Sequence, residues 1–276
     1  MSKKKLIIIG KKSFIGSNLY ELINDKKNIL LLNLDQFLRL KKIEINRYSY
    51  LCDCTDEKVK LKKINKNLSK NENKIINKIK DIDINYIFLS SRRVYFPKYN
   101  INEKSKVKPI DTYSKNKLIT EKILSKLIRN RLLILRISNV IGFKKYDKYR
   151  KIHHTFFDNY LQIIKSNKKQ EYVNFFKDFI TIKQLAKVFS IILKNEISGI
   201  YNVSIGRKIF IKEMLGWLNT HNLNKKIFSE KKASKKYIKI HSFTLNNKKL
   251  SNKIKYKPNK NELKIFCEKI SRYIHN

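Results

Sequence analysis

The sequence predicts an α/β protein with a Rossmann-type, doubly wound parallel sheet and a smaller C-terminal lobe. Two observations carry this expectation. Short apolar runs, typical of buried parallel strands, alternate with segments whose apolar residues recur at helical spacing. A glycine-containing loop, residues 10–16, joins the first run to the first helical segment. Alternation of strands and helices over most of a chain favours a parallel sheet with helices on both faces.

The elements follow one another in a regular order. The helical segments are expected around residues 15–23, 75–79, 118–127 and 185–192, where apolar residues recur every three or four positions. The third of the predicted strands is the least regular. The six predicted strands are Leu6–Ile9, Ile29–Leu34 (closed by Asp35), Tyr48–Cys54, Tyr86–Leu89, Leu132–Ile137 and Gly199–Val203.

Length and hydropathy place the chain among globular proteins without a membrane span. Its 276 residues are 42% hydrophobic, enough to bury a core. No apolar run approaches the roughly 20 residues that a spanning helix needs. The N-terminus, Met1 to Lys5, runs directly into the first strand and lacks the features of a secretory signal. A cytoplasmic protein is therefore expected.

The formal charge of +42 is large, and it raises nucleic acid as a partner. The lysines are spread over the whole chain, and no zinc-finger spacing, aromatic RNA-binding motif or isolated basic tail accompanies them. Nucleic acid is therefore disfavoured as a partner, and most lysines are expected on solvated faces. A nucleic-acid-binding protein stays as the alternative that charge alone supports, and it predicts affinity that falls steeply with salt.

Cysteine and histidine usage gives no sign of a metal site. The three cysteines, Cys52, Cys54 and Cys267, lack a second Cys or His pair at zinc spacing, so reduced structural thiols are expected. The pair His153–His154 is adjacent in sequence and has no carboxylate cluster beside it, which disfavours metal binding. No bound metal is predicted.

The loop at residues 10–16, with the sequence GKKSFIG, has the placement of a dinucleotide-binding turn. Glycine permits the tight turn, and the start of the following helix offers free amides and a positive dipole to a pyrophosphate. The middle position of the fingerprint is a serine here. The predicted cofactor-binding residues of this loop are Gly10, Ser13, Phe14, Ile15 and Gly16.

Asp35 is the candidate for contact with the cofactor ribose. It follows Gly16 by about 20 residues, the separation at which a carboxylate binds the ribose hydroxyls of NAD. A helix cap or turn residue is the alternative interpretation of Asp35. The basic residues Lys11, Lys12 and Arg39 lie near in sequence and keep a 2′-phosphate, and thus NADP, open, with NAD favoured.

Ser91, Tyr113 and Lys117 form the candidate catalytic set. Tyr113 and Lys117 are four residues apart on a predicted helix, so both project from one face. A nearby ammonium lowers the pKa of a phenol from its reference of about 10 and makes it a usable proton acceptor or donor. Ser91 ends a predicted strand, where its hydroxyl could bond the same substrate oxygen. Such a set suits removal of an alcohol proton while hydride leaves for a nicotinamide ring.

The stretches 88–95 (FLSSRRVY) and 113–121 (YSKNKLITE) resemble the extended short-chain dehydrogenase/reductase family, in its NAD-dependent epimerase/dehydratase and sugar-nucleotide reductase branch. The resemblance implies an NAD(P)-dependent enzyme that acts on a nucleotide-activated sugar, with Ser91, Tyr113 and Lys117 as its catalytic residues. It also implies that Tyr113 and Lys117 contact the cofactor. Polysaccharide biosynthesis is the kind of role that such a substrate suggests.

Three further stretches resemble the same family in collinear order. The stretch 135–142 (LRISNVIG) resembles a strand end whose asparagine, Asn139 here, touches the substrate diphosphate. The stretch 177–180 (KDFI) resembles a motif whose basic residue, Lys177 here, contacts the nucleotide phosphates. A third match is 199–204 (GIYNVS). With the earlier motifs, the resemblance covers roughly residues 5–215.

The departures from the family pattern are informative. Asp35 and Ser91 are closer in sequence than in the family, so one strand–helix unit is expected to be trimmed. Asp53 is then either the family's adenine-contacting aspartate or a residue of the following strand, where that role does not exist. Arg92 and Arg93 occupy the positions of the Asp-Glu pair with which family 4,6-dehydratases eliminate water. Dehydration is therefore disfavoured, and keto reduction and epimerisation both stay open.

The resemblance also suggests a division of the chain. Residues 1–143 are expected to form the dinucleotide-binding Rossmann domain, with 178–203 returning to it, and 144–276 to form mainly the substrate-binding lobe. The expected partner is the nucleotide-sugar substrate, and a homodimer is one oligomeric state considered. The alternative function is a non-catalytic, cofactor-binding relative that acts as a sensor or scaffold.

Overall fold

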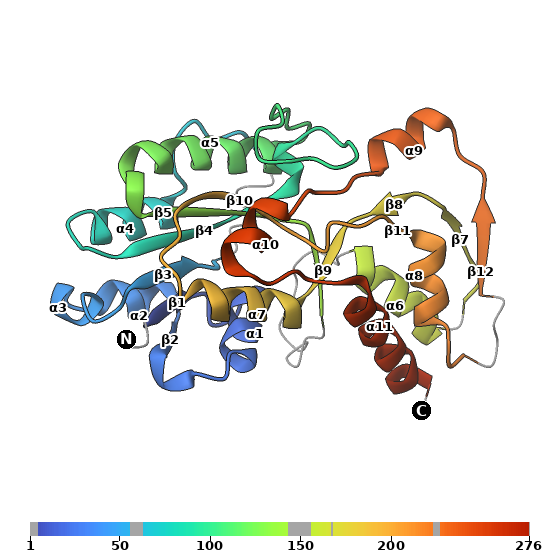
Figure 1. The fold of residues 1–276 in the computed structure, drawn as a ribbon, viewed down its shortest axis with the longest axis horizontal. Coiled ribbons are helices and arrows are strands. Elements are labelled where there is room, and N and C mark those ends of the chain that lie inside the picture. The colour runs from blue at the N-terminus through green and yellow to red at the C-terminus, as the bar shows by residue number, and fades with distance from the viewer. Residues whose placement is uncertain (1–4, 56–62, 143–155, 167, 223–226, 276) are drawn as a thin grey trace.

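The computed structural model describes residues 5–55, 63–142, 156–166, 168–222 and 227–275 (Figure 1). Its centre is a parallel six-stranded sheet in the order β10-β5-β4-β3-β1-β2, which confirms the predicted α/β fold. The strands of this sheet are β1 (Leu6–Ile9), β2 (Ile29–Leu32), β3 (Tyr50–Asp53), β4 (Asn85–Ser91), β5 (Leu132–Ile137) and β10 (Gly199–Val203).

Strand β2 ends earlier than predicted, because a helix cap follows it directly. The side chain of Asn33 accepts a hydrogen bond from the Gln36 amide (2.8 Å), and the Gln36 side chain accepts one from the Asn33 amide (3.0 Å). This capping box starts the short helix α2 (Leu34–Arg39). The prediction that Asp35 closes the strand is therefore wrong, since Asp35 lies in the first turn of α2.

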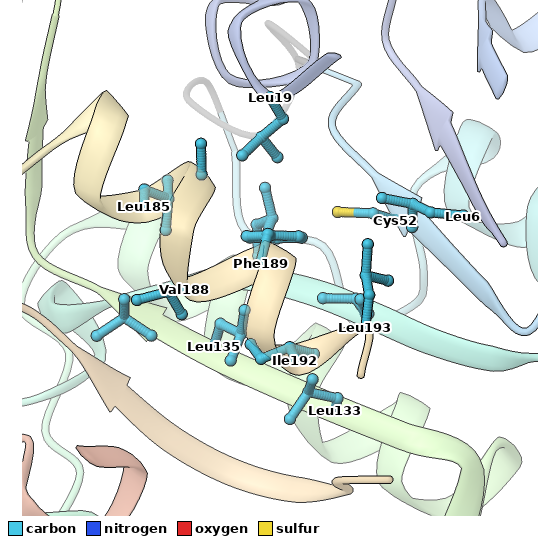
Figure 2. Packing of buried hydrophobic residues seen from close by; sticks show 14 of the residues in the cluster. Leu6, Leu19, Cys52, Leu133, Leu135, Leu185, Val188, Phe189, Ile192 and Leu193 are labelled. Atoms are coloured by element: carbon cyan, nitrogen blue, oxygen red, sulfur yellow. The ribbon is translucent and has the colours of Figure 1, made fainter. Parts of the chain in front are cut away.

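Alternate side chains of the strands face two hydrophobic layers, as the pleat requires. Leu6 and Ile8 pack into a cluster shared with helices α1 (Phe14–Leu22), α7 (Ile182–Ile192) and α10 (Lys248–Ile254). Figure 2 shows Phe189 and Ile192 of α7 in this layer, with Leu135 of β5 and Cys52 of β3.

The opposite layer holds Ile7 and Ile9. Figure 1 shows α4 and α5 on the other side of the sheet from α1 and α7. The helices of this second layer are α2, α3 (Lys42–Ile45), α4 (Lys70–Ile79) and α5 (Thr112–Leu127).

The place of β3 shows which unit of the sheet is missing. In the Rossmann order 3-2-1-4-5-6, the third strand lies outside the second. Here β3 lies between β1 and β4, and no described strand lies outside β2. The trimmed unit is therefore the outer strand. Asp53 belongs to the strand that follows it, so of the two alternatives for Asp53 the adenine-contacting one does not hold.

The C-terminal half builds a second cluster beyond the carboxyl end of β5. Strand β6 (Asn139–Ile141) starts two residues after β5 ends and pairs with β9 (Phe179–Thr181). Helices α6 (Phe156–Ser166), α8 (Ile211–Leu218) and α11 (Lys260–His275) surround a separate core. Around this core lie β7 (Gln170–Val173) with β12 (Phe228–Lys231), β8 (Phe176–Lys177) with β11 (Ile209–Phe210), and α9 (Lys235–His241).

Two further observations complete the fold. Short 3₁₀ turns, η1 (Lys26–Asn28), η3 (Arg92–Val94) and η4 (Arg129–Arg131), connect the larger elements. Among the described residues, none of the helices combines the length and the apolar composition that crossing a membrane demands.

Candidate active site

The loop between β1 and α1 needs glycine at both of its ends. Gly10 has a φ of +131°, and a Cβ there would lie 2.8 Å from the Cys54 carbonyl oxygen. A Cβ on Gly16 would lie 2.6 Å from the carbonyl oxygen of Gly10. The Gly10 amide also donates to the Leu32 carbonyl at 2.8 Å, which holds the loop against the end of β2. The tight turn expected at these positions is therefore present.

Ser13, at the middle position of the loop, caps helix α1. Its Oγ accepts a hydrogen bond from the Gly16 amide at 2.9 Å. Its φ is −81°, a value that any residue adopts, so the loop closes without a glycine there. The helix that follows presents the first amides of an α-helix N-terminus, together with its positive dipole, beside Phe14 and Ile15.

Asn33, which sequence reasoning missed, is the first residue after β2. It is exposed and adjoins Leu32, whose carbonyl accepts the amides of Gly10 and Lys11. Asp35 is exposed as well and is the second residue of α2. The signal for Asn33 was present in the sequence as Asn-x-x-Gln, the pattern of a capping box.

The structure brings Ser91, Tyr113 and Lys117 to the carboxyl end of β4. The Lys117 ammonium points toward the sheet, donating to the Leu89 carbonyl at 2.8 Å, and lies 5.9 Å from the centroid of the Tyr113 ring. Ser91 is the last residue of β4, and its Oγ accepts from the Arg93 amide at 3.2 Å. All three side chains are half-buried.

A buried polar network fixes helix α5 against the sheet. Glu121 of α5 accepts hydrogen bonds from Ser90 Oγ (2.5 Å) and from Arg136 Nε (3.0 Å) and Nη2 (2.6 Å). Arg136 also donates to the hydroxyl of Tyr95 (2.7 Å), which in turn donates to Asn202 (3.1 Å). The network therefore ties α5, which carries Tyr113 and Lys117, to β4, β5 and β10.

Asn139 contacts the segment that carries Lys177, at the start of the C-terminal half. The side-chain amide of Asn139 donates to the carbonyl of Asp178 at 2.9 Å, next to Lys177 in β8. Asp178 is fully buried and accepts from the amides of Gly206 (3.1 Å) and Leu245 (2.9 Å). Burial raises the pKa of Asp178 to about 7 despite these hydrogen bonds.

Positive charge gathers beside the candidate catalytic set. Burial and the charge of Arg93 lower the pKa of Arg92 to about 9, which still leaves a cation at neutral pH. Burial and the charges of Arg92 and Arg93 lower the pKa of Lys177 to about 8. Burial, Lys177 and Arg92 also lower the pKa of His241. Arg92 thus acts on the pKa of both Lys177 and His241, which are distant from it in sequence.

Metal-ligating side chains do not cluster in the described part of the chain, which contains no group of three or more His, Cys, Asp or Glu residues suited to an ion. The pair His153–His154 lies outside the described residues. Cys52, Cys54 and Cys267 are free thiols, all buried. The Sγ atoms of Cys52 and Cys54 are 3.6 Å apart, and both residues belong to the hydrophobic layer that holds Leu6 and Ile8.

The comparisons with known proteins identify the family and the fold. The sequence model of the NAD dependent epimerase/dehydratase family matches residues 62–204. No curated protein matches the chain in sequence. Among solved structures, the chain is similar to UDP-N-acetylglucosamine 4-epimerase from Methanobrevibacter ruminantium M1 in complex with UDP-N-acetylmuramic acid, with 18% identity, a TM-score of 0.76 and coverage of 99% of this chain and 98% of that one.

Two further structures carry a dinucleotide. dTDP-glucose 4,6-dehydratase from Bacillus anthracis in complex with NAD shows 15% identity and a TM-score of 0.74, covering 98% of this chain and 96% of that one. The protein RMD from Pseudomonas aeruginosa, complexed with NADPH, shows 15% identity and a TM-score of 0.75, covering 99% and 100%. At these identities the likeness establishes the shared fold along the whole chain.

Proposed function

Because the chain belongs to the NAD-dependent epimerase/dehydratase family, we propose that it is an NAD(P)-dependent oxidoreductase or epimerase that acts on a nucleotide-activated sugar by hydride transfer. The observation that carries this proposal is the approach of Lys117 to Tyr113 at the carboxyl end of β4. Ligands bind at that end of the strands in open α/β sheets.

The residues of the first loop fit a dinucleotide. Gly10 and Gly16 leave the space that a Cβ would fill, and the N-terminus of α1 suits a diphosphate. Ser13 caps helix α1 at the middle position and is compatible with the tight turn. We propose Gly10, Ser13, Phe14, Ile15, Gly16 and Asp35 as cofactor-binding residues, together with Tyr113 and Lys117. Solved structures of the same fold carry NAD in one case and NADPH in another, which supports NAD(P) as the cofactor class.

Tyr113 is the proton acceptor in this proposal. The Lys117 ammonium favours the phenolate, so Tyr113 can take the proton of a sugar hydroxyl while the Ser91 hydroxyl bonds the same oxygen. A bound nicotinamide dinucleotide supplies the hydride acceptor or donor. In the reverse direction Tyr113 returns its proton to the oxygen of a keto sugar. The carbonyl of Leu89 keeps Lys117 on the inner face of α5 throughout.

The reaction type follows from what stands next to Ser91. Arg92 and Arg93 have no carboxyl group to protonate a leaving hydroxyl or to accept a carbon-bound proton. Elimination of water is therefore disfavoured, and reduction and epimerisation both need only Ser91, Tyr113, Lys117 and the cofactor. Asn139 and Lys177 are proposed to bind the diphosphate of the nucleotide sugar.

The test combines cofactor binding with turnover in Tyr113→Phe. We expect wild-type protein to bind NAD or NADP and to turn over a nucleotide sugar from a panel of UDP, dTDP and GDP sugars. Tyr113→Phe is expected to lose turnover by about 100- to 10,000-fold, the range for a general acid–base group, while it keeps its thermal stability and still binds the cofactor. Tyr99→Phe, at an exposed tyrosine, is the matched control.

Two outcomes contradict the proposal. Full activity in Tyr113→Phe would show that the mechanism is wrong. Dinucleotide binding without turnover of any sugar in the panel would instead identify a non-catalytic relative that acts as a sensor or scaffold.

A further inference from the structure

A cation stands directly beside the proposed catalytic serine. Arg92 follows Ser91 at the end of β4, and its Cζ lies 3.5 Å from the centroid of the Phe243 ring. This distance is a cation–π contact, which favours one position of the guanidinium over the ring. The side chain is half-buried, so its donors are partly withdrawn from water.

Lys177 reaches the same place from the C-terminal half of the chain. The amide of Phe243 donates to the carbonyl of Phe176 at 3.2 Å, so the ring under Arg92 is bonded to the residue that precedes Lys177. The ammonium of Lys177 lies 5.2 Å from the centroid of the Phe175 ring. Arg92 lies close enough to disfavour the charge of Lys177, whose pKa is lowered by burial and by the charges of Arg92 and Arg93.

The carboxylate of Asp111, which lies near Arg92, is paired with another arginine. Arg93 forms an ion pair with Asp111 at 2.8 Å. Arg92, in contrast, has no ion-pair partner in the described ranges. A half-buried guanidinium that forms no ion pair of its own, close to a second cation, is an environment that an anion stabilises.

The position of Arg92 indicates which part of a substrate would carry that anion. Ser91 and Tyr113 mark where the reacting sugar carbon must lie, and Arg92 is the next residue in the chain. We propose that Arg92 binds a carboxylate carried by the sugar itself, next to the diphosphate that Lys177 is proposed to bind, so that the substrate class is a nucleotide-activated acidic sugar. This inference rests on the proposed function and narrows its substrate. A guanidinium fork matches a carboxylate with two parallel hydrogen bonds.

The test measures binding of paired ligands by calorimetry in the presence of NAD or NADP. Each pair is a uronic-acid nucleotide sugar and its neutral counterpart, such as UDP-glucuronate and UDP-glucose, with dTDP and GDP pairs alongside. In wild-type protein we expect the acidic member of one pair to bind about 10- to 100-fold more tightly, as charge-assisted hydrogen bonds do. Arg92→Gln removes the charge-assisted hydrogen bonds to the carboxylate. The ratio of the two affinities is therefore expected to fall to about threefold or less.

Two more variants separate charge at this position from charge in general. Arg92→Lys keeps the charge and loses the planar fork, and an intermediate preference is expected. Lys122→Ala removes one positive charge from the exposed side of α5, and the preference of the wild type is expected to persist. Circular dichroism of each variant checks that the fold is retained.

The outcomes of this test differ from those of the proposed function. Equal affinity within every pair, or no binding of any acidic member, overturns the acidic-sugar inference. A preference that survives Arg92→Gln also overturns it. Neither result touches the hydride-transfer proposal, which depends on turnover in Tyr113→Phe. Conversely, a protein without turnover would still show the preference, because the readout is binding alone.

Discussion

The guanidinium of Arg136 and the carboxylate of Glu121 form a bidentate pair, with nitrogen–oxygen distances of 2.6 and 3.0 Å. Their side chains are 5% and 3% exposed. Since Glu121 lies on α5 and Arg136 on β5, the pair holds the helix of Tyr113 and Lys117 in register with the strand beneath it. Removal of this ion pair is expected to lower the stability of the fold, and to affect catalysis only through the position of α5.

Glu121→Gln tests the contribution of this pair to stability. The change leaves the Arg136 charge buried without its counter-ion, and we expect the free energy of unfolding to fall by about 3–5 kcal/mol. Urea denaturation measures the loss. The double variant Glu121→Leu with Arg136→Met removes both charges and is expected to recover part of it. A loss below about 1 kcal/mol in Glu121→Gln would contradict the role given to the pair.

Gly16→Ala tests the packing of the first loop. The new Cβ would meet the Gly10 carbonyl at 2.6 Å and Ser13 Oγ at 2.7 Å, so the backbone must shift. We expect a loss of about 1–3 kcal/mol in unfolding free energy, with weaker dinucleotide binding. Gly216→Ala is the matched control, because nothing lies within 4 Å of its Cβ and it is inside helix α8. That control should gain up to about 1 kcal/mol from helix propensity, and equal stability of the two variants would speak against the close packing.

The protonation of Lys177 should make anion binding depend on pH. Its pKa in the ligand-free protein is about 8, lowered by burial and by Arg92 and Arg93. Below pH 8 the ammonium is present and attracts an anion, whereas above pH 8 binding must be accompanied by proton uptake. Affinity for UDP-glucuronate is therefore expected to fall by up to about tenfold per pH unit above pH 8. Calorimetry from pH 6.5 to 9.5 measures this decline, and Lys177→Met should lack it.

The same lysine should cost stability in the ligand-free protein. Its pKa is about 8 when folded and 10.5 ordinarily, so the folded protein binds the Lys177 proton less well than the unfolded chain. At pH 7 both states are protonated and the full penalty is present; it disappears as pH rises from 8 to 10.5. Lys177→Met is therefore expected to raise the unfolding free energy at pH 7 by about 1–3 kcal/mol. The difference in unfolding free energy between Lys177→Met and the wild type should narrow by pH 10. A difference that stays constant with pH would show that the gain comes from packing instead.

Sequence reasoning captured the central sheet because its strands are continuous apolar runs. The bounds of β1, β5 and β10 coincide with the prediction, and those of β3 lie inside it. The error at Asp35 arose because apolar Leu34 continues the run of β2, although Asn33 and Gln36 already encode a helix start. Local hydrogen bonding decided the boundary there, and hydrophobicity did not.

The candidate site was predicted where its residues are close in sequence. Tyr113 and Lys117 share a helix turn, so their proximity follows from spacing alone. The approach of Lys177 to Arg92 joins positions far apart in the chain through Phe243 and Phe176, and no local pattern encodes it. The short pairs β7–β12 and β8–β11 also join distant parts of the chain. They were missed because strands of two to four residues carry no periodic signal.

The place of β2 at the rim of the sheet bears on how the protein behaves in solution. The outward amides and carbonyls of β2 face no strand in the described part of the chain, and such a rim can template pairing with a second molecule. The formal charge of +42 opposes that encounter by repulsion between copies. Salt screens this repulsion over about 8 Å at physiological ionic strength. Concentrated salt and polyanions should therefore promote self-association, so colloidal stability depends on the lysines that the chemistry does not use.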